Sequence, residues 1–148
     1  MDLLQDPVDT PFPAKSRAVV ASVHGIPTEA CVRVFTDKIM LTLSQDGRLA
    51  QWIQVPIRAT PAAMAGLTLA HPRADMLPGS HISPTTLLGG GGSQREMAGH
   101  LLASQIANYI SLRSPEDERT LLLGLGLREL QASQEGLLDV MELVQQVI

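Results

Sequence analysis

Four short β-rich runs lie between Arg17 and Ile57, and they limit what this chain can fold into more than any other feature. They read AVVASV, TEACVRVFT, KIMLTLSQ and LAQWIQVPI, and residues typical of turns separate them. The last turn contains Asp46-Gly47, a pair that tolerates the positive φ values of a two-residue hairpin turn. The runs predict four antiparallel strands in a meander.

Two further strands are expected in the second half of the chain. Residues 85–88 predict a short fifth strand, which precedes the four glycines at 89–92. Residues 120–127 read TLLLGLGL, a continuous apolar run that favours a central strand over an edge strand. Gly124 and Gly126 alternate with leucines in this run, and we expect their missing side chains to let a helix pack closely.

Two segments have the apolar spacing of amphipathic helices. In the first, apolar residues recur at helical intervals from Met97 to Ile110, and Ser93 and Glu96 have the spacing of a capping box. The second covers the residues from Leu137 to the C-terminus and has Ser133 as its expected N-cap. Each helix is long enough to cover part of one sheet face.

Two other segments predict irregular structure. Prolines interrupt the first fifteen residues, and we expect residues 1–15 to form a flexible leader. Residues 58–84 hold four more prolines among small side chains and predict a long loop. The remaining segments belong to one domain over residues 16–148.

The order of the segments predicts the α+β class, with a mainly antiparallel sheet of about six strands and two helices on one face. A two-residue turn at Asp37-Lys38 would place Phe35 opposite Met40 and Arg33 opposite Thr42. Apolar side chains occupy both alternating sets of strand positions. The face without helices should therefore pack on a partner sheet, since exposed apolar surface forfeits about 25 cal/mol per Å².

The strand around Trp52 has two possible orientations. Ile53 and Val55 lie on one of its faces and Trp52 lies on the other. If the Asp46-Gly47 turn has two residues, Ile53 and Val55 join Phe35 and Met40 on the partner face. If the turn has three residues, Trp52 replaces them.

Composition excludes several classes of function. Eleven Lys and Arg against fifteen Asp and Glu give a net charge of −4, and the basic residues are scattered, so no nucleic-acid partner is expected. The only cysteine, Cys31, cannot form an internal disulfide. The sequence has neither a secretory signal nor an apolar run of about 20 residues, so we expect no membrane association and a location in the cytoplasm or also the nucleus.

No motif for catalysis, metal binding or cofactor binding is recognisable. The glycines at 89–92 precede a helix, but Gln94 stands where a dinucleotide fingerprint needs glycine, and no P-loop lysine follows. The four histidines have no metal-ligand spacing, and Cys31 lies inside a predicted strand without a partner base. We expect no enzymatic activity, no cofactor and no metal.

The chain resembles the proteasome assembly chaperone 3 family over residues 19–55 and 85–148. The resemblance rests on four motifs in order: His24-Gly25-Ile26-Pro27-Thr28-Glu29 before the second strand, Thr86-Leu87-Leu88-Gly89 before the first helix, TLLLGLGLRE between the helices, and GLLDVMELVQQVI at the C-terminus. Each motif is short, and their order makes the similarity specific. The acidic leader, the loop over residues 58–84 and the glycine run depart from the family pattern.

The resemblance implies a non-enzymatic chaperone for assembly of the 20S proteasome core particle. Such a protein forms a heterodimer with a homologous protein, assembly chaperone 4, and their sheets pack face to face with the helices outside. The pair binds a proteasome α-type subunit, with α5 the expected one, while the α-ring forms, and it leaves before the particle is complete. A homodimer is expected when the chain is expressed alone.

Seven residues are candidates for partner binding. They are Glu29, Arg33, Phe35, Met40, Trp52, Ile53 and Val55. Glu29 and Arg33 are chosen for contact with the α-subunit, because they carry charge at exposed strand positions, and the acidic turn from Arg113 to Arg119 is a further place for that contact. The alternative function is a small dimeric adaptor or scaffold domain unrelated to the proteasome.

Overall fold

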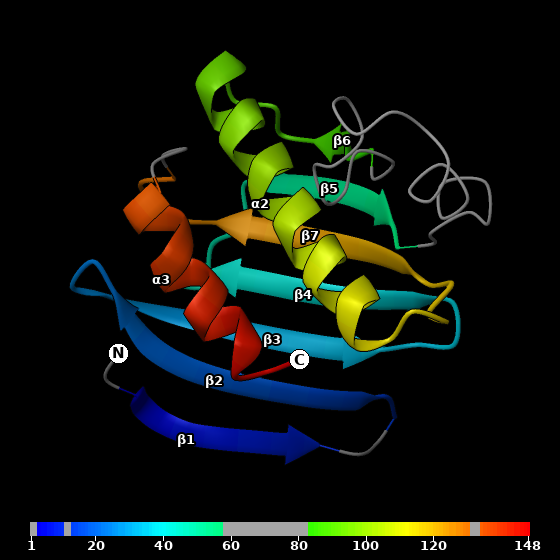
Figure 1. Ribbon diagram of the computed structural model, residues 1–148. Helices are drawn as coiled ribbons and strands as arrows, with labels where there is room; N and C mark the ends of the chain where they lie inside the picture. The colour runs from blue at the N-terminus through cyan, green and yellow to red at the C-terminus, as the bar shows by residue number, and fades with distance from the viewer. Residues whose placement is uncertain (1–2, 11–12, 58–82, 131–133) are drawn as a thin grey trace.

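The computed structural model describes residues 3–10, 13–57, 83–130 and 134–148. Within these ranges, seven strands form one open sheet, and two helices lie on one of its faces (Figure 1). The predicted α+β class is confirmed, with one strand more than expected. The elements are β1 (Leu3–Thr10), β2 (Lys15–Val23), β3 (Ile26–Val34), β4 (Lys38–Ser44), β5 (Gln51–Pro56), β6 (Thr85–Leu88), α2 (Ser93–Arg113), β7 (Thr120–Gly126) and α3 (Gln134–Gln145).

The strand order across the sheet is β1-β2-β3-β4-β7-β5-β6. β7 runs parallel to β4 and antiparallel to β5, and the other neighbouring pairs are antiparallel. The prediction that residues 120–127 form a central strand is confirmed. Leu121, Leu123 and Leu125 are buried on the face that the helices cover, and Gly124 and Gly126 on the other face are buried too, which explains why the run shows no polar alternation.

The predicted four-strand meander is wrong at its last step, because β5 does not pair with β4. The Asp46-Gly47 turn forms as expected, with positive φ at both residues and a bridge between Gln45 and Arg48. The chain then crosses β7 and continues on its far side. A Cβ atom on Gly126 would lie 1.5 Å from the carbonyl oxygen of Arg48, so the crossing requires glycine at this position.

The β3–β4 hairpin differs from the predicted register by two residues. Its turn is Thr36-Asp37, closed by a 2.8 Å hydrogen bond from the Phe35 amide to the Lys38 carbonyl. Arg33 therefore lies opposite Met40, and Phe35 lies beyond the strand. A shift of two residues leaves every side chain on its predicted face, whereas a shift of one would reverse them all.

The sequence predicts a flexible leader over residues 1–15, but the structure has strand β1 there. β1 pairs with β2 at the edge of the sheet, and its register shifts between Gln5 and Val8, around Pro7. Proline lacks an amide donor and is tolerated on an edge strand. Residues 58–82 of the predicted loop lie outside the described residues.

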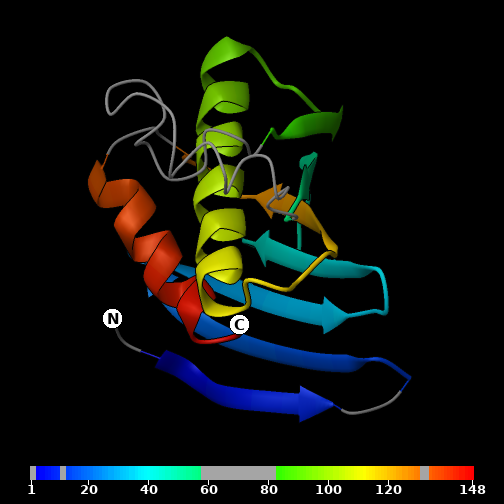
Figure 2. The same cartoon turned by 45° about the vertical axis from the view of Figure 1, so that its right-hand side comes forward.

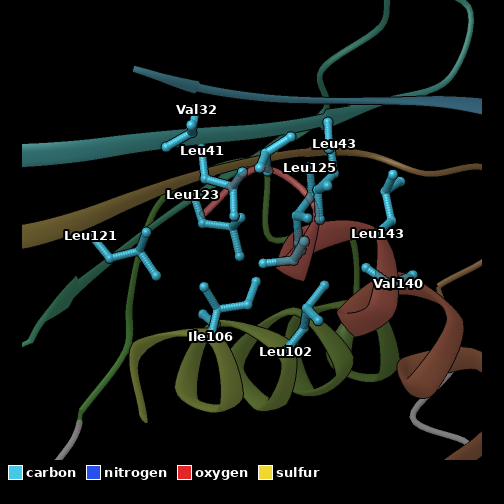
Figure 3. Close-up of a cluster of buried hydrophobic side chains, with 14 of the residues drawn as sticks. Val32, Leu41, Leu43, Leu102, Ile106, Leu121, Leu123, Leu125, Val140 and Leu143 are labelled. Atoms are coloured by element: carbon cyan, nitrogen blue, oxygen red, sulfur yellow. The ribbon is translucent and has the colours of Figure 1, made fainter. Parts of the chain in front are cut away.

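The core lies between the sheet and the two helices. Figure 3 shows Leu102 and Ile106 of α2 pointing toward Leu121 and Leu123 of β7, and α3 contributes Leu143 beside them. All five side chains are fully buried. Burying a leucine or isoleucine contributes about 1.5–3 kcal/mol, so this layer contributes strongly to stability.

Helix α2 begins without the predicted capping box. Gly92 is the N-cap residue, and no side chain caps the first turn. Glu96 instead accepts a 3.0 Å hydrogen bond from the Thr86 hydroxyl, while His100 lies 2.7 Å from the same hydroxyl oxygen. The carboxylate that would have capped the helix joins α2 to the edge strand β6. The predicted N-cap of α3, Ser133, lies outside the described residues.

Candidate functional site: an uncovered sheet face

The sheet face opposite the helices has no covering element among the described residues. Figures 1 and 2 show α2 and α3 on the same side of the sheet in both views. We call the opposite side the open face. Strand pairing assigns to it rows of side chains that cross the strands at right angles, and three neighbouring rows form its centre.

The central row of the open face crosses all seven strands and contains no charged residue. Each member pairs with the next, and the row consists of Val8, Ala18, Cys31, Thr42, Gly124, Trp52 and Leu88. Val8 is 50% exposed and Leu88 is 67% exposed at the two ends, while Ala18, Cys31, Thr42 and Trp52 are half-buried. The row is a continuous band of apolar or small side chains.

The two flanking rows bring polar groups beside this band. One row contains Ser16, Arg33, Met40, Leu122 and Gln54, and the other contains Val20, Glu29, Ser44 and Gly126. Arg33 and Glu29 are the exposed charged residues of β3 in these rows. An apolar centre with charges at its margin is the usual composition of a protein–protein interface.

Trp52 lies across Gly124 at the centre of the open face. A Cβ atom on Gly124 would lie only 3.0 Å from the indole carbons Cη2 and Cζ3. The sequence suggested that the two glycines of β7 let a helix pack closely, and this prediction is wrong. Gly124 makes room for the indole of Trp52, and Gly126 makes room for the chain crossing at Arg48.

The structure brings four predicted partner-binding residues to the open face. Glu29, Arg33, Met40 and Trp52 all project there, although Trp52 was predicted there only for a three-residue turn. Phe35 follows β3 and is 42% exposed near the turn. Whether these residues bind a partner stays a prediction.

Ile53 and Val55 lie on the covered face, which corrects their assignment to the partner face. Both are 0% exposed, and they pair with Leu123 and Leu121 in the core. The prediction assumed that β5 pairs directly with β4, so that the length of the Asp46-Gly47 turn decides which side chains of β5 share a face with those of β4. Since β7 separates these strands, the turn length does not set the orientation of β5.

Sequence reasoning missed Leu122 and Leu88 as parts of the open face, whereas it placed Thr42 there with the wrong pairing partner. Leu122 stands in an unbroken leucine run, in which the spacing does not distinguish the two faces. Leu88 pairs with Trp52 on the edge strand, and Thr42 pairs with Cys31. The sequence predicted Arg33 as the partner of Thr42, because its hairpin register differed by two residues from the observed one.

Outside the open face, we searched the described residues for a metal site, a membrane-spanning helix and a role for the glycine connector. No group of three or more His, Cys, Asp or Glu in those residues could hold a metal ion. Neither described helix is long and apolar enough to cross a membrane. Gly89 has a φ of 74°, and a Cβ there would lie 1.8 Å from the Ala50 carbonyl oxygen, so packing of the connector accounts for this glycine.

The acidic turn between α2 and β7 contains one strong ion pair. Asp117 accepts hydrogen bonds from the Arg119 amide, Nε and Nη2 at 2.7–3.0 Å. The hydrogen bonds from the Arg119 side chain lower the pKa of the Asp117 carboxyl. These two charges compensate each other, whereas Glu116 in the same turn is exposed.

Comparison with known proteins gives a similarity of fold. No family model matches the sequence. No curated protein matches it significantly either. A crystal structure of a chaperone complex for yeast 20S proteasome assembly contains a similar chain, with a TM-score of 0.52, 12% identity, and coverage of 98% of this chain and 97% of that chain. This protein therefore shares its overall fold, along nearly its full length, with a chain of that chaperone complex.

Proposed function

We propose that this protein is a non-enzymatic chaperone for 20S proteasome assembly. It pairs through its open face with a second chaperone of the same fold, and the pair binds an α-type subunit, with α5 the expected one, while the α-ring forms. The central row from Val8 to Leu88, which no described element covers, is the observation that carries the pairing. The similarity in fold to a chain of the yeast chaperone complex supports the role in proteasome assembly.

The chemistry of the open face favours a sheet as its occupant. The central row is apolar, and side chains of two stacked sheets interdigitate in a layer about 10 Å thick. Trp52, Met40 and Leu122 are large apolar groups near its centre, where binding energy is usually concentrated. A stable contact of this kind buries about 800 Å² on each partner, which a face crossing seven strands can supply.

Glu29 and Arg33, which the sequence assigned to contact with the α-subunit, belong to the margin of this pairing surface, because their rows flank the central row. A chaperone must also release its α-type subunit, so that second contact should be polar and of modest size. The acidic turn over residues 113–119 is suited to it, since Glu116 is exposed and lies outside the open face. We therefore expect pairing and α-subunit capture to use different surfaces.

The test is affinity purification of the tagged protein from its native cells. The wild type should co-purify a second small chaperone and α-type subunits in early assembly intermediates. Trp52→Glu should lose the second chaperone, because it buries a charge in the apolar centre of the contact. The matched control is Leu138→Glu, which changes a residue of α3 that is 60% exposed, and it should retain both partners.

Three outcomes would contradict the proposal. Stoichiometric retention of the protein in the mature core particle would mean that it is a subunit and not a chaperone. Capture of an unrelated partner by the wild type, without any α-type subunit, would favour the adaptor function. Loss of both partners in the Leu138→Glu control would mean that the open face is not the surface in question.

A further inference from the structure

A groove on the helix-covered side of the sheet lies beyond the end of α3. It has a volume of about 480 Å³, and its lining includes Val32 and Val34 of β3 and Val147 after α3. Val32 is 5% exposed and Val147 is 3% exposed, so they form an apolar floor. The open face is on the other side of the sheet, and both surfaces can be occupied together.

The margin of this groove is cationic. Lys15 pairs with Val34, and Arg17 pairs with Val32, so both side chains stand beside the apolar floor. Asp9 lies opposite Arg17 on β1 and is the one carboxylate lining the groove among the described residues. Two cations and one anion leave a net positive margin, in a chain whose total net charge is −4.

The ion pair within the groove is weak and can exchange its partner. The distance from Arg17 Nε to Asp9 Oδ1 is 3.6 Å, and the two side chains are 44% and 76% exposed. An exposed pair at this distance contributes little, because water screens both charges. Lys15 is exposed and forms no ion pair within the described part of the chain. Both cations are available to a ligand carboxylate.

We infer that this groove binds an acidic, apolar peptide segment of another protein. An apolar side chain of the segment fills the space above Val32, Val34 and Val147, and a neighbouring carboxylate accepts hydrogen bonds from Arg17 and Lys15. Guanidinium groups suit this role because their planar donors match a carboxylate. The volume is within the range of ligand pockets, about 300–1,000 Å³. The inference goes beyond the proposed function and uses a different surface.

Fluorescence anisotropy with a labelled synthetic peptide, Gly-Glu-Val-Leu-Glu-Gly, tests the inference. Arg17→Gln and Lys15→Gln should each weaken binding by about two- to fivefold, as expected for a solvent-exposed ion pair. Asp9→Asn should tighten binding, because it removes the carboxylate that competes for Arg17. Added salt should weaken binding to the wild type.

Three controls keep the test decisive. Arg48→Gln removes an equal charge from an exposed turn at another part of the sheet and should leave the affinity unchanged. The peptide Gly-Gln-Val-Leu-Gln-Gly should bind more weakly than the acidic one. Thermal unfolding should confirm that each variant is folded.

Absence of saturable binding to the acidic peptide would overturn the inference. Equal affinity for the acidic and the amide peptide would also overturn it, because the groove would then not recognise charge. If Arg48→Gln weakened binding of the acidic peptide as much as Arg17→Gln does, the loss would follow from net charge and not from the groove. That result would also overturn the inference. None of these results bears on pairing through Trp52, so the two proposals fail separately.

Discussion

Gly124 and Gly126 stand two residues apart on β7, yet a side chain would meet different neighbours at each. At Gly124 a Cβ would approach the indole ring of Trp52, a side chain that can move. At Gly126 it would lie 1.5 Å from the backbone oxygen of Arg48, which is held by the chain crossing. The same residue type in the same strand therefore has two different structural roles.

Gly126→Ala should destabilise the protein by more than about 2 kcal/mol, because the clash with Arg48 can be relieved only by moving backbone. Gly124→Ala should cost less and should shift the tryptophan emission, since Trp52 must move and is the only tryptophan. Urea unfolding followed by circular dichroism measures the first effect. Equal costs for the two variants would contradict these roles.

Asp117 is a single residue whose contribution to stability depends on pH. Its side chain is 4% exposed, and the Arg119 hydrogen bonds lower its pKa below the ordinary value of 3.8. A carboxyl whose pKa is lower in the folded state stabilises the protein above the unfolded pKa, and this stabilisation is lost as the pH falls through the folded pKa.

Asp117→Asn should therefore lower the free energy of unfolding at neutral pH by about 1.5–3 kcal/mol, the contribution of a charge-assisted hydrogen bond. The difference between the wild type and Asp117→Asn should shrink as the pH falls below the ordinary pKa of 3.8. Urea titrations at several pH values measure it. If the difference in the free energy of unfolding between the two proteins did not vary with pH, the carboxylate charge of Asp117 would not be the cause of the stabilisation.

At the scale of elements, β7 is where prediction from the sequence succeeded in part. Its leucine run correctly indicated a buried central strand, because both neighbours of the strand supply apolar pairs. Its position between β4 and β5 could not be predicted, since a parallel pairing with β4 leaves no local turn signal. The incorrect placement of Ile53 and Val55 followed directly from this.

The β3–β4 hairpin shows the opposite case. The register was wrong by two residues, because the turn lies at Thr36-Asp37 and not one residue later. Arg33 and Met40 nevertheless lie on the predicted face, since side chains alternate with a period of two. Alternation thus predicts a face more reliably than it predicts which residues are opposite each other.

Leu122 and Leu123 provide a direct test of the two faces of β7. Leu123→Ala should lower the free energy of unfolding by about 2–5 kcal/mol, because Leu123 is 0% exposed in the core. Leu122→Ala should cost clearly less, because Leu122 is half-buried on the open face. Urea unfolding of the two variants measures the difference. Similar costs at a protein concentration where the chain sediments as a monomer would mean that the open face is already covered within one chain.

At the scale of the whole molecule, the sheet is asymmetric. Both helices cover one face, and the other face carries the central row from Val8 to Leu88 without cover among the described residues. The sequence predicted this asymmetry from the number of helices and from apolar residues at both sets of strand positions. It could not predict which residues form the row, because the row depends on the position of β7.

Sedimentation velocity of the isolated protein at about 20 µM tests the central claim most directly, since association at such concentrations reflects a usable apolar surface. The wild type should sediment as a dimer or larger species, Trp52→Glu as a monomer, and Leu138→Glu like the wild type. Trp52→Glu must also retain the wild-type circular dichroism spectrum. A monomeric wild type, or a folded Trp52→Glu variant that associates as strongly as the wild type, would contradict the account.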